Sequence, residues 1–171
     1  MPGKINKAKK QAHILPMIAI IGRPNVGKSS LFNRLIQERV AVTYEEAGTT
    51  RDRIYHHLEL LDLTSILIDT GGIEVGKKEN IETDIQTQAR LGIDEADLII
   101  FVVNGSEPLT ANDYEAAKIL RRAQKNVVFV ANKIDTPAHA EGTYEFYDLG
   151  FGEPILISTI HNRGIDQLEG A

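Results

Sequence analysis

The chain has 171 residues, of which 42% are hydrophobic, enough for one sizeable core but too few for two ordinary domains. It contains no cysteine, which excludes disulfides, thiolate metal sites and thiol nucleophiles and is typical of a cytoplasmic protein. The longest apolar run, Leu98 to Val103, is far shorter than the roughly 20 residues that a membrane-spanning helix needs. We therefore expect one compact cytoplasmic domain without a membrane span.

The formal net charge is −5, although four lysines lie within the first eleven residues. The rest of the chain is therefore more acidic than the whole, which argues against a broad electrostatic face for nucleic acid on this domain. We expect residues 1–15 to form a basic, disordered leader, with local contact to phosphate as the alternative. Residues 16–171 are expected to form the folded domain, with a last helix that is cut short at Ala171.

Apolar periodicity predicts strands that alternate with helices along the chain. The expected strands are 17–21, 53–61, 65–69, 98–103, 127–131 and 154–158, and the expected helices are 28–37, 81–96, 111–122 and 141–149, with one more after Gly164. The second and third strands are too close in sequence for parallel pairing, so they form a hairpin. The pattern predicts an α/β fold with a mostly parallel six-stranded sheet, one antiparallel strand, and helices on both faces. Ligands of such folds bind at the carboxyl ends of the strands.

The first expected strand and helix are joined by Gly22-Arg-Pro-Asn-Val-Gly27-Lys28-Ser29, which matches the phosphate-loop pattern G-x-x-x-x-G-K-[ST]. Backbone N–H groups of such a loop wrap phosphates, Lys28 reaches the β- and γ-phosphates, and the Ser29 hydroxyl ligates Mg²⁺. The sequence therefore predicts a P-loop NTPase. The candidate phosphate-binding residues are Gly22, Arg23, Pro24, Asn25, Val26, Gly27, Lys28, Ser29 and Ser30.

Two further segments are candidates for the γ-phosphate and metal end of the site. The D-x-x-G spacing of Asp69, Thr70, Gly71 and Gly72 places a carboxylate near Mg²⁺ and a glycine N–H near the γ-phosphate. Thr50 lies in a long polar stretch, where its hydroxyl could close over Mg²⁺; the alternative is a flexible loop with incidental threonines. The candidate Mg²⁺ ligands are thus Ser29, Thr50 and Asp69, and the candidate catalytic residues are Lys28, Thr50 and Gly72.

A guanine-binding motif is predicted where the strand 127–131 ends, at Asn132-Lys133-Ile-Asp135. The Asp135 carboxylate can accept hydrogen bonds from both N1–H and the 2-amino group of guanine, and adenine offers neither pairing. A wrong base would leave that carboxylate desolvated and unpaired. The motif favours GTP or GDP as ligand and disfavours an ATP-using enzyme.

The motifs resemble those of the Era-like bacterial GTPases of the TRAFAC class, whose fold is the Ras-like G domain. Besides the segments already named, the resemblance rests on Gly48-Thr-Thr-Arg-Asp52 and Asp69-Thr-Gly-Gly-Ile73. The segments 95–103 and 146–152 are similar to the first G domain of the double-Era-like EngA (Der) family, and the likeness covers residues 16–169. It implies a role for Ser158, Thr159 and Ile160 in contacting the guanine edge. It also implies assembly of the large ribosomal subunit as the process, with that subunit or its rRNA, a second G domain and a KH-like domain as partners.

The residue after Gly72 is Ile73, where Ras-like GTPases have a glutamine that orients the attacking water. Isoleucine cannot form that hydrogen bond, so we expect slow intrinsic hydrolysis. Related GTPases with a hydrophobic residue here often use K⁺, held partly by a phosphate-loop asparagine, and Asn25 occupies the matching position. The alternative is that Asn25 only shapes the loop.

Two readings of the function remain open at this point. In the first, the domain is a switch that binds GTP with Mg²⁺, hydrolyses it slowly and changes its affinity for a partner. In the second, it is a nucleotide-gated module for binding the ribosome or neighbouring domains, with negligible turnover.

Overall fold

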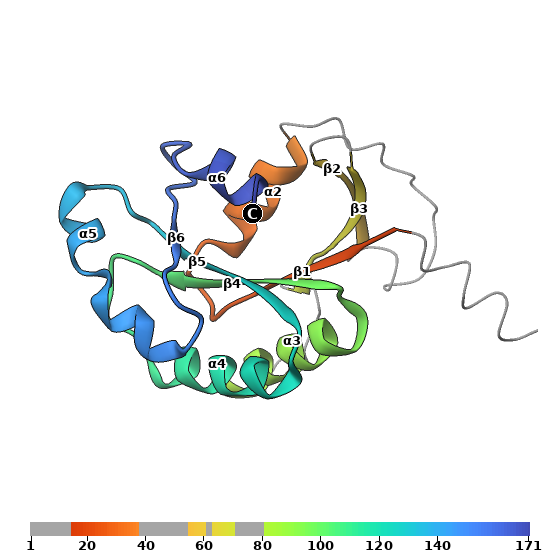
Figure 1. The fold of residues 1–171 in the computed structure, drawn as a ribbon, viewed down its shortest axis with the longest axis horizontal. Helices are drawn as coiled ribbons and strands as arrows, with labels where there is room; N and C mark the ends of the chain where they lie inside the picture. The colour runs from red at the N-terminus through yellow and green to blue at the C-terminus, as the bar shows by residue number, and fades with distance from the viewer. Residues whose placement is uncertain (1–14, 38–54, 61–62, 71–80) are drawn as a thin grey trace, which may run out of the picture.

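The computed structural model describes residues 15–37, 55–60, 63–70 and 81–171. The strands are β1 (Met17–Ile21), β2 (Tyr55–Leu60), β3 (Leu63–Ile68), β4 (Leu98–Asn104), β5 (Asn126–Asn132) and β6 (Ile155–Leu156). The helices are α2 (Lys28–Gln37), α3 (Ile81–Glu95), α4 (Ala111–Ala123), α5 (Pro137–Glu141), the 3₁₀ helix η2 (Thr143–Leu149) and α6 (Ile165–Glu169). Strands and helices mostly alternate along the described ranges, except that β2 is followed by β3 and α5 by η2 (Figure 1).

The six strands form one sheet in the order β2-β3-β1-β4-β5-β6. β1 lies inside the sheet and pairs in parallel with β3 on one side and β4 on the other. β4 also pairs in parallel with β5, and β5 with β6. β2 pairs with β3 in the antiparallel direction. The expected α/β fold, with a mostly parallel six-stranded sheet and one antiparallel strand, is confirmed.

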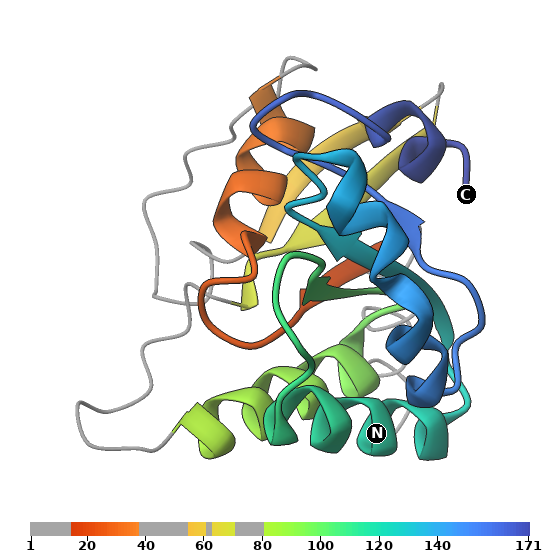
Figure 2. The same cartoon turned by 90° about the vertical axis from the view of Figure 1, so that its left-hand side faces the viewer.

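Helices cover both faces of the sheet, so its central strands are apolar on both sides. In Figure 1 the sheet lies between α2 and α6 on one face and α3 and α4 on the other, and the turned view of Figure 2 shows the same two layers. Alternate residues of β1 divide between two cores: Ala19 and Ile21 pack with α3, α4 and η2, while Ile18 and Ile20 pack with α2 and α6. This alternation is the two-residue period of a strand.

The last third of the chain differs from the expected elements. Instead of one α-helix over residues 141–149, α5 begins at Pro137 and ends before Gly142, and the 3₁₀ helix η2 follows. Proline is favoured in the first turn of a helix because its missing N–H is not needed there, which explains the earlier start. The expected strand 154–158 is also shorter, since only Ile155 and Leu156 form β6. Proline at position 154 has no N–H to donate to a neighbouring strand.

None of the helices within the described ranges is long and apolar enough to cross a membrane.

Candidate functional site

The sequence motifs lie in loops that follow the carboxyl ends of parallel strands. The phosphate loop follows β1, Asp69 follows β3, and Asn132 is the last residue of β5. Since these strands run in the same direction, their carboxyl ends meet at one edge of the sheet. The topology therefore brings together motifs that are far apart in sequence, such as Val26 and Asn132, which are 106 positions apart.

The phosphate loop has a backbone shape that its sequence explains. Asn25 and Gly27 have φ angles of 68° and 91°, in the left-handed region that glycine and asparagine tolerate best. Val26, between them, is fully buried and fixes the loop to the core. Helix α2 begins directly afterwards, with the Leu31 N–H donating to the Gly27 carbonyl over 2.9 Å. The loop thus ends at a helix N-terminus, which favours binding of an anion.

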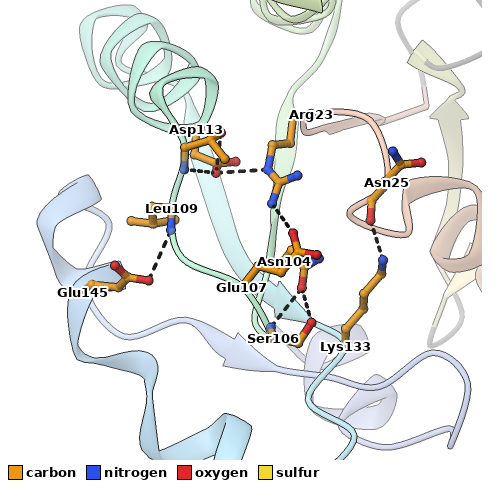
Figure 3. Close-up of polar contacts among 10 residues, drawn as sticks. Arg23, Asn25, Asn104, Ser106, Glu107, Leu109, Asp113, Lys133 and Glu145 are labelled. Atoms are coloured by element: carbon orange, nitrogen blue, oxygen red, sulfur yellow. Dashed lines mark hydrogen bonds and ion pairs between the residues drawn. The ribbon is translucent and has the colours of Figure 1, made fainter.

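The guanine motif is bonded directly to the phosphate loop. The Asn132 side-chain Nδ2 donates to the Val26 carbonyl over 3.0 Å. The Lys133 Nζ donates to the Asn25 carbonyl over 2.5 Å (Figure 3). Asn132 is fully buried, so its bond is protected from competition by water. The two predicted motifs therefore form one unit.

The guanine-edge loop is fixed to the same unit. The Ser158 hydroxyl donates to Asp135 Oδ1 over 2.6 Å, and the Thr159 N–H donates to Asn132 Oδ1 over 3.3 Å. Arg34 of α2 donates from Nη2 to the Thr159 carbonyl over 2.7 Å. The predicted residues Asp135, Ser158 and Thr159 are thus brought together, and Ile160 beside them is exposed. Sequence reasoning missed Arg34, which no motif marked.

The Arg23 side chain is engaged with residues that precede and begin α4. Its Nε donates to Asp113 Oδ2 over 3.2 Å and its Nη2 to Glu107 Oε2 over 3.1 Å (Figure 3). Asp113 is 1% exposed and also accepts from the Thr110 N–H over 2.8 Å, while its Oδ1 is buried without a hydrogen bond among the described residues. Arg23 therefore ties the phosphate loop to the start of α4. The spacing of Thr110 and Asp113 is a helix-start signal, but nothing in it marks Arg23 as the partner.

Lys28 is the first residue of α2, and Asp69 directly follows β3. The Lys28 Nζ donates to Gln88 Oε1 of α3 over 2.8 Å, a contact that sequence reasoning missed. Ser29 is exposed in the first turn of α2, and Asp69 is partly exposed. Thr70 is buried and donates its hydroxyl proton to the Ile20 carbonyl, which ties the start of the D-x-x-G segment to β1.

The hydroxyl of Ser29 and the carboxylate of Asp69 are oxygen donors of the kind that Mg²⁺ takes, with phosphate oxygens and water completing its shell. Within the part of the chain that the structure describes, no group of three or more His, Asp or Glu side chains could hold a metal ion. The donor set thus fits an ion shared with a nucleotide. Thr50, Gly71, Gly72 and Ile73 lie outside the described residues.

The phosphate loop and the start of the guanine motif lie within the part of the chain that is similar to known proteins. Residues 17–133 match the family model described as 50S ribosome-binding GTPase. The chain is 54% identical over 153 residues to the GTPase Der of Halalkalibacterium halodurans and 51% identical to that of Geobacillus kaustophilus. Each alignment covers 90% of this chain and 35% of the relative, so the chain spans about a third of the length of the curated relatives it matches.

Solved structures agree with this result. An Era variant from Aquifex aeolicus bound to GDP and AlF₄⁻ superimposes with a TM-score of 0.66 at 28% identity, over 90% of this chain and 54% of that one. Era in complex with MgGDPNP and a segment of 16S ribosomal RNA gives the same values. The expected resemblance to the Era-like and Der GTPases is confirmed. The chain therefore belongs to the 50S ribosome-binding GTPase family.

Proposed function

We propose that this domain is a slowly hydrolysing GTP switch that acts, as part of a longer chain, in assembly of the large ribosomal subunit. The observation that carries the proposal is the bonding of the phosphate loop to the guanine motif through Asn132 and Lys133. A preassembled site of this kind binds base and phosphates together with little reorganisation.

Guanine selection rests on Asp135. Its carboxylate has about four lone-pair sites, so it can accept the Ser158 hydroxyl and still accept N1–H and the 2-amino group of guanine. The Thr159 and Ile160 backbone would face the other edge of the base. An adenine nucleotide would leave the carboxylate without those donors, which is a large penalty in a partly buried site.

The phosphates would lie across the backbone N–H groups of residues 22–30 other than Pro24, which has none, with Lys28 directed at the β- and γ-phosphates. Ser29, Asp69 and Thr50 are the proposed protein ligands of Mg²⁺, as GTPases of this family generally use that ion. When bound, the ion would neutralise charge that develops on the phosphate oxygens. Gly72 would donate its N–H to the γ-phosphate, and water would attack in line without a covalent intermediate.

Turnover is expected to be slow because Ile73 cannot orient the attacking water. We further propose K⁺ as a second cation, held partly by Asn25. The proposal rests on the resemblance to GTPases with a hydrophobic residue at the position of Ile73, and Asn25 is exposed in the phosphate loop. A cation there would supply charge stabilisation that other GTPases obtain from an arginine. If Asn25 only shapes the loop, hydrolysis has no K⁺ dependence.

The proposed partners belong to the whole protein, since the chain spans 35% of its Der relatives. They are a second G domain and a KH-like domain in the same polypeptide, together with the large ribosomal subunit or its rRNA, in the cytoplasm. The Era complex that superimposes on this domain includes a segment of 16S ribosomal RNA, which supports an RNA-linked role. The alternative is a nucleotide-gated binding module with negligible turnover.

Single-turnover GTP hydrolysis in Mg²⁺ buffers matched for Na⁺ or K⁺ separates these readings. The proposal predicts slow hydrolysis that K⁺ accelerates, and loss of that acceleration in Asn25→Ala. Hydrolysis that is equal in the two buffers refutes the K⁺ site. Binding of GTP without turnover in either buffer favours the binding module.

A further inference from the structure

Gln88 is a buried polar residue of α3 whose side-chain oxygen faces the phosphate loop. It is 7% exposed, and its Oε1 lies 2.8 Å from Lys28 Nζ and 3.4 Å from the Gly22 backbone nitrogen. One amide oxygen therefore accepts from the loop's cation and from its first backbone N–H. A buried uncharged acceptor bonded to an ammonium fixes the direction of that ammonium while leaving its charge in place.

The helix that carries Gln88 is held close to the strand that leads into the phosphate loop. One turn after Gln88, a Cβ atom added at Gly92 would lie 2.6 Å from Ile21 Cδ1, so α3 and β1 are in close contact there. Ile85 and Ala89 of α3 are fully buried in the same core as Ile21. The Gln88 oxygen is therefore placed by a rigid contact between helix and strand.

We propose that Gln88 is a positioning residue, which holds the Lys28 ammonium at the place where the β- and γ-phosphates bind. An ammonium carries three N–H donors, so its bond to Gln88 is compatible with further bonds to phosphate oxygens. An unrestrained lysine side chain loses much rotamer entropy when it is fixed on a ligand, and the bond to Gln88 reduces that loss before the nucleotide arrives. The inference rests on the proposed role of Lys28 as a phosphate ligand.

A consequence is that the phosphate site depends on the position of α3. This helix begins at Ile81, soon after the segment that contains Gly72. A shift of α3 relative to β1 would move the Gln88 oxygen away from Lys28 and weaken phosphate binding. Gln88 thus links the position of α3 to the affinity for nucleotide.

The test compares GDP with GMP, because GMP lacks the phosphate that Lys28 would contact. Gln88→Met removes the acceptor and keeps a long, unbranched side chain. We expect it to lower GDP affinity on the order of tenfold, the effect of losing a hydrogen bond to a charged group. GMP affinity should change by less than about twofold. Gln88→Leu, which also lacks the acceptor, gives the same readout if the methionine variant does not fold.

The matched control is Gln86→Met, two positions earlier on α3. A two-residue step turns the side chain by about 200° around the helix, away from the phosphate loop. This variant should bind both nucleotides as the native chain does. Equal losses for GDP and GMP in Gln88→Met would indicate general damage, and an unchanged or higher GDP affinity would show that Gln88 does not assist Lys28. Each of these results overturns the inference.

Lys28→Ala distinguishes a failure of this inference from a failure of the proposed function. If Lys28→Ala lowers GDP affinity, adding Gln88→Met in that background should cause no further selective loss of GDP over GMP. A further selective loss means that Gln88 acts independently of Lys28, which overturns the inference alone. If Lys28→Ala leaves GDP affinity unchanged, the proposed phosphate role of Lys28 is wrong, and the inference falls with it.

Discussion

The side-chain amide of Asn132 donates to the carbonyl oxygen of Val26 over 3.0 Å, although the two residues are 106 positions apart in the chain. The other side of the same amide, Oδ1, accepts the Thr159 N–H over 3.3 Å. One buried asparagine therefore connects the phosphate loop, the end of β5 and the guanine-edge loop. Both the stability of the fold and the affinity for nucleotide should therefore depend on Asn132.

Replacing Asn132 by alanine should affect both properties. The change leaves the Val26 carbonyl and the Thr159 N–H without their partner in a buried place. We expect a loss of about 3 kcal/mol in the free energy of unfolding, from the cost of burying unpaired polar groups. Urea unfolding measures this loss, and a GDP titration should show at least a tenfold lower affinity, equivalent to about 1.4 kcal/mol. Native-like unfolding would show that the three segments are held by other contacts.

Arg23 forms ion pairs with Asp113 and with Glu107, and substitutions can test which of the two stabilises the fold. Arg23→Ala removes the cation that pairs with Asp113, which is 1% exposed. The buried carboxylate then lacks the positive charge that offsets its loss of hydration. We expect a destabilisation of about 3 kcal/mol, as for breaking a buried pair by removing one partner.

Glu107→Ala is the matched control for that change. It breaks the other bond of Arg23, but the Glu107 side chain is 58% exposed, so the loss should stay below about 1 kcal/mol. Urea unfolding of the two variants gives the comparison. A larger loss for Glu107→Ala than for Arg23→Ala would contradict the assignment of the buried pair as the stabilising one.

Arg34→Ala should loosen the guanine-edge loop without removing a residue that touches the base. Arg34 Nη2 donates to the Thr159 carbonyl over 2.7 Å, which restrains the backbone beside the proposed guanine position. The loss of this charged donor should speed GDP release by roughly fivefold to tenfold. Release of a fluorescent GDP analogue in stopped flow measures the rate. An unchanged rate would mean that Ser158 and Asn132 hold the loop without help from α2.

Much of the site could be predicted from the sequence because its parts are local patterns. The phosphate loop is a contiguous motif between a strand and a helix, and the apolar periods of residues 17–21 and 28–37 identify both neighbours. The guanine motif is likewise contiguous, at the end of a strand that is apolar on both faces. Their adjacency follows from the rule for carboxyl ends of parallel strands.

The contacts that fix the motifs to one another could not be predicted in this way. Arg23–Asp113, Lys28–Gln88 and Arg34–Thr159 join residues that are 90, 60 and 125 positions apart. Each depends on the placement of a helix against the sheet, which no local period specifies. The change from an α-helix to a 3₁₀ helix over 143–149 is another such case, because its apolar spacing suits either form.

The central claim is that Asp135 selects guanine in a preassembled site, and Asp135→Asn tests it most directly. An asparagine can accept from N1–H and donate to a 2-oxo group, so it should favour xanthine over guanine, while Ser158 can still donate to its side-chain oxygen. The measurement is the affinity of GDP and of xanthosine diphosphate (XDP), determined by competition, for the native chain and for Asp135→Asn. We predict that GDP affinity falls by at least about 100-fold and that XDP becomes the tighter ligand. Native-like GDP affinity in Asp135→Asn, with XDP still the weaker ligand, would contradict the claim.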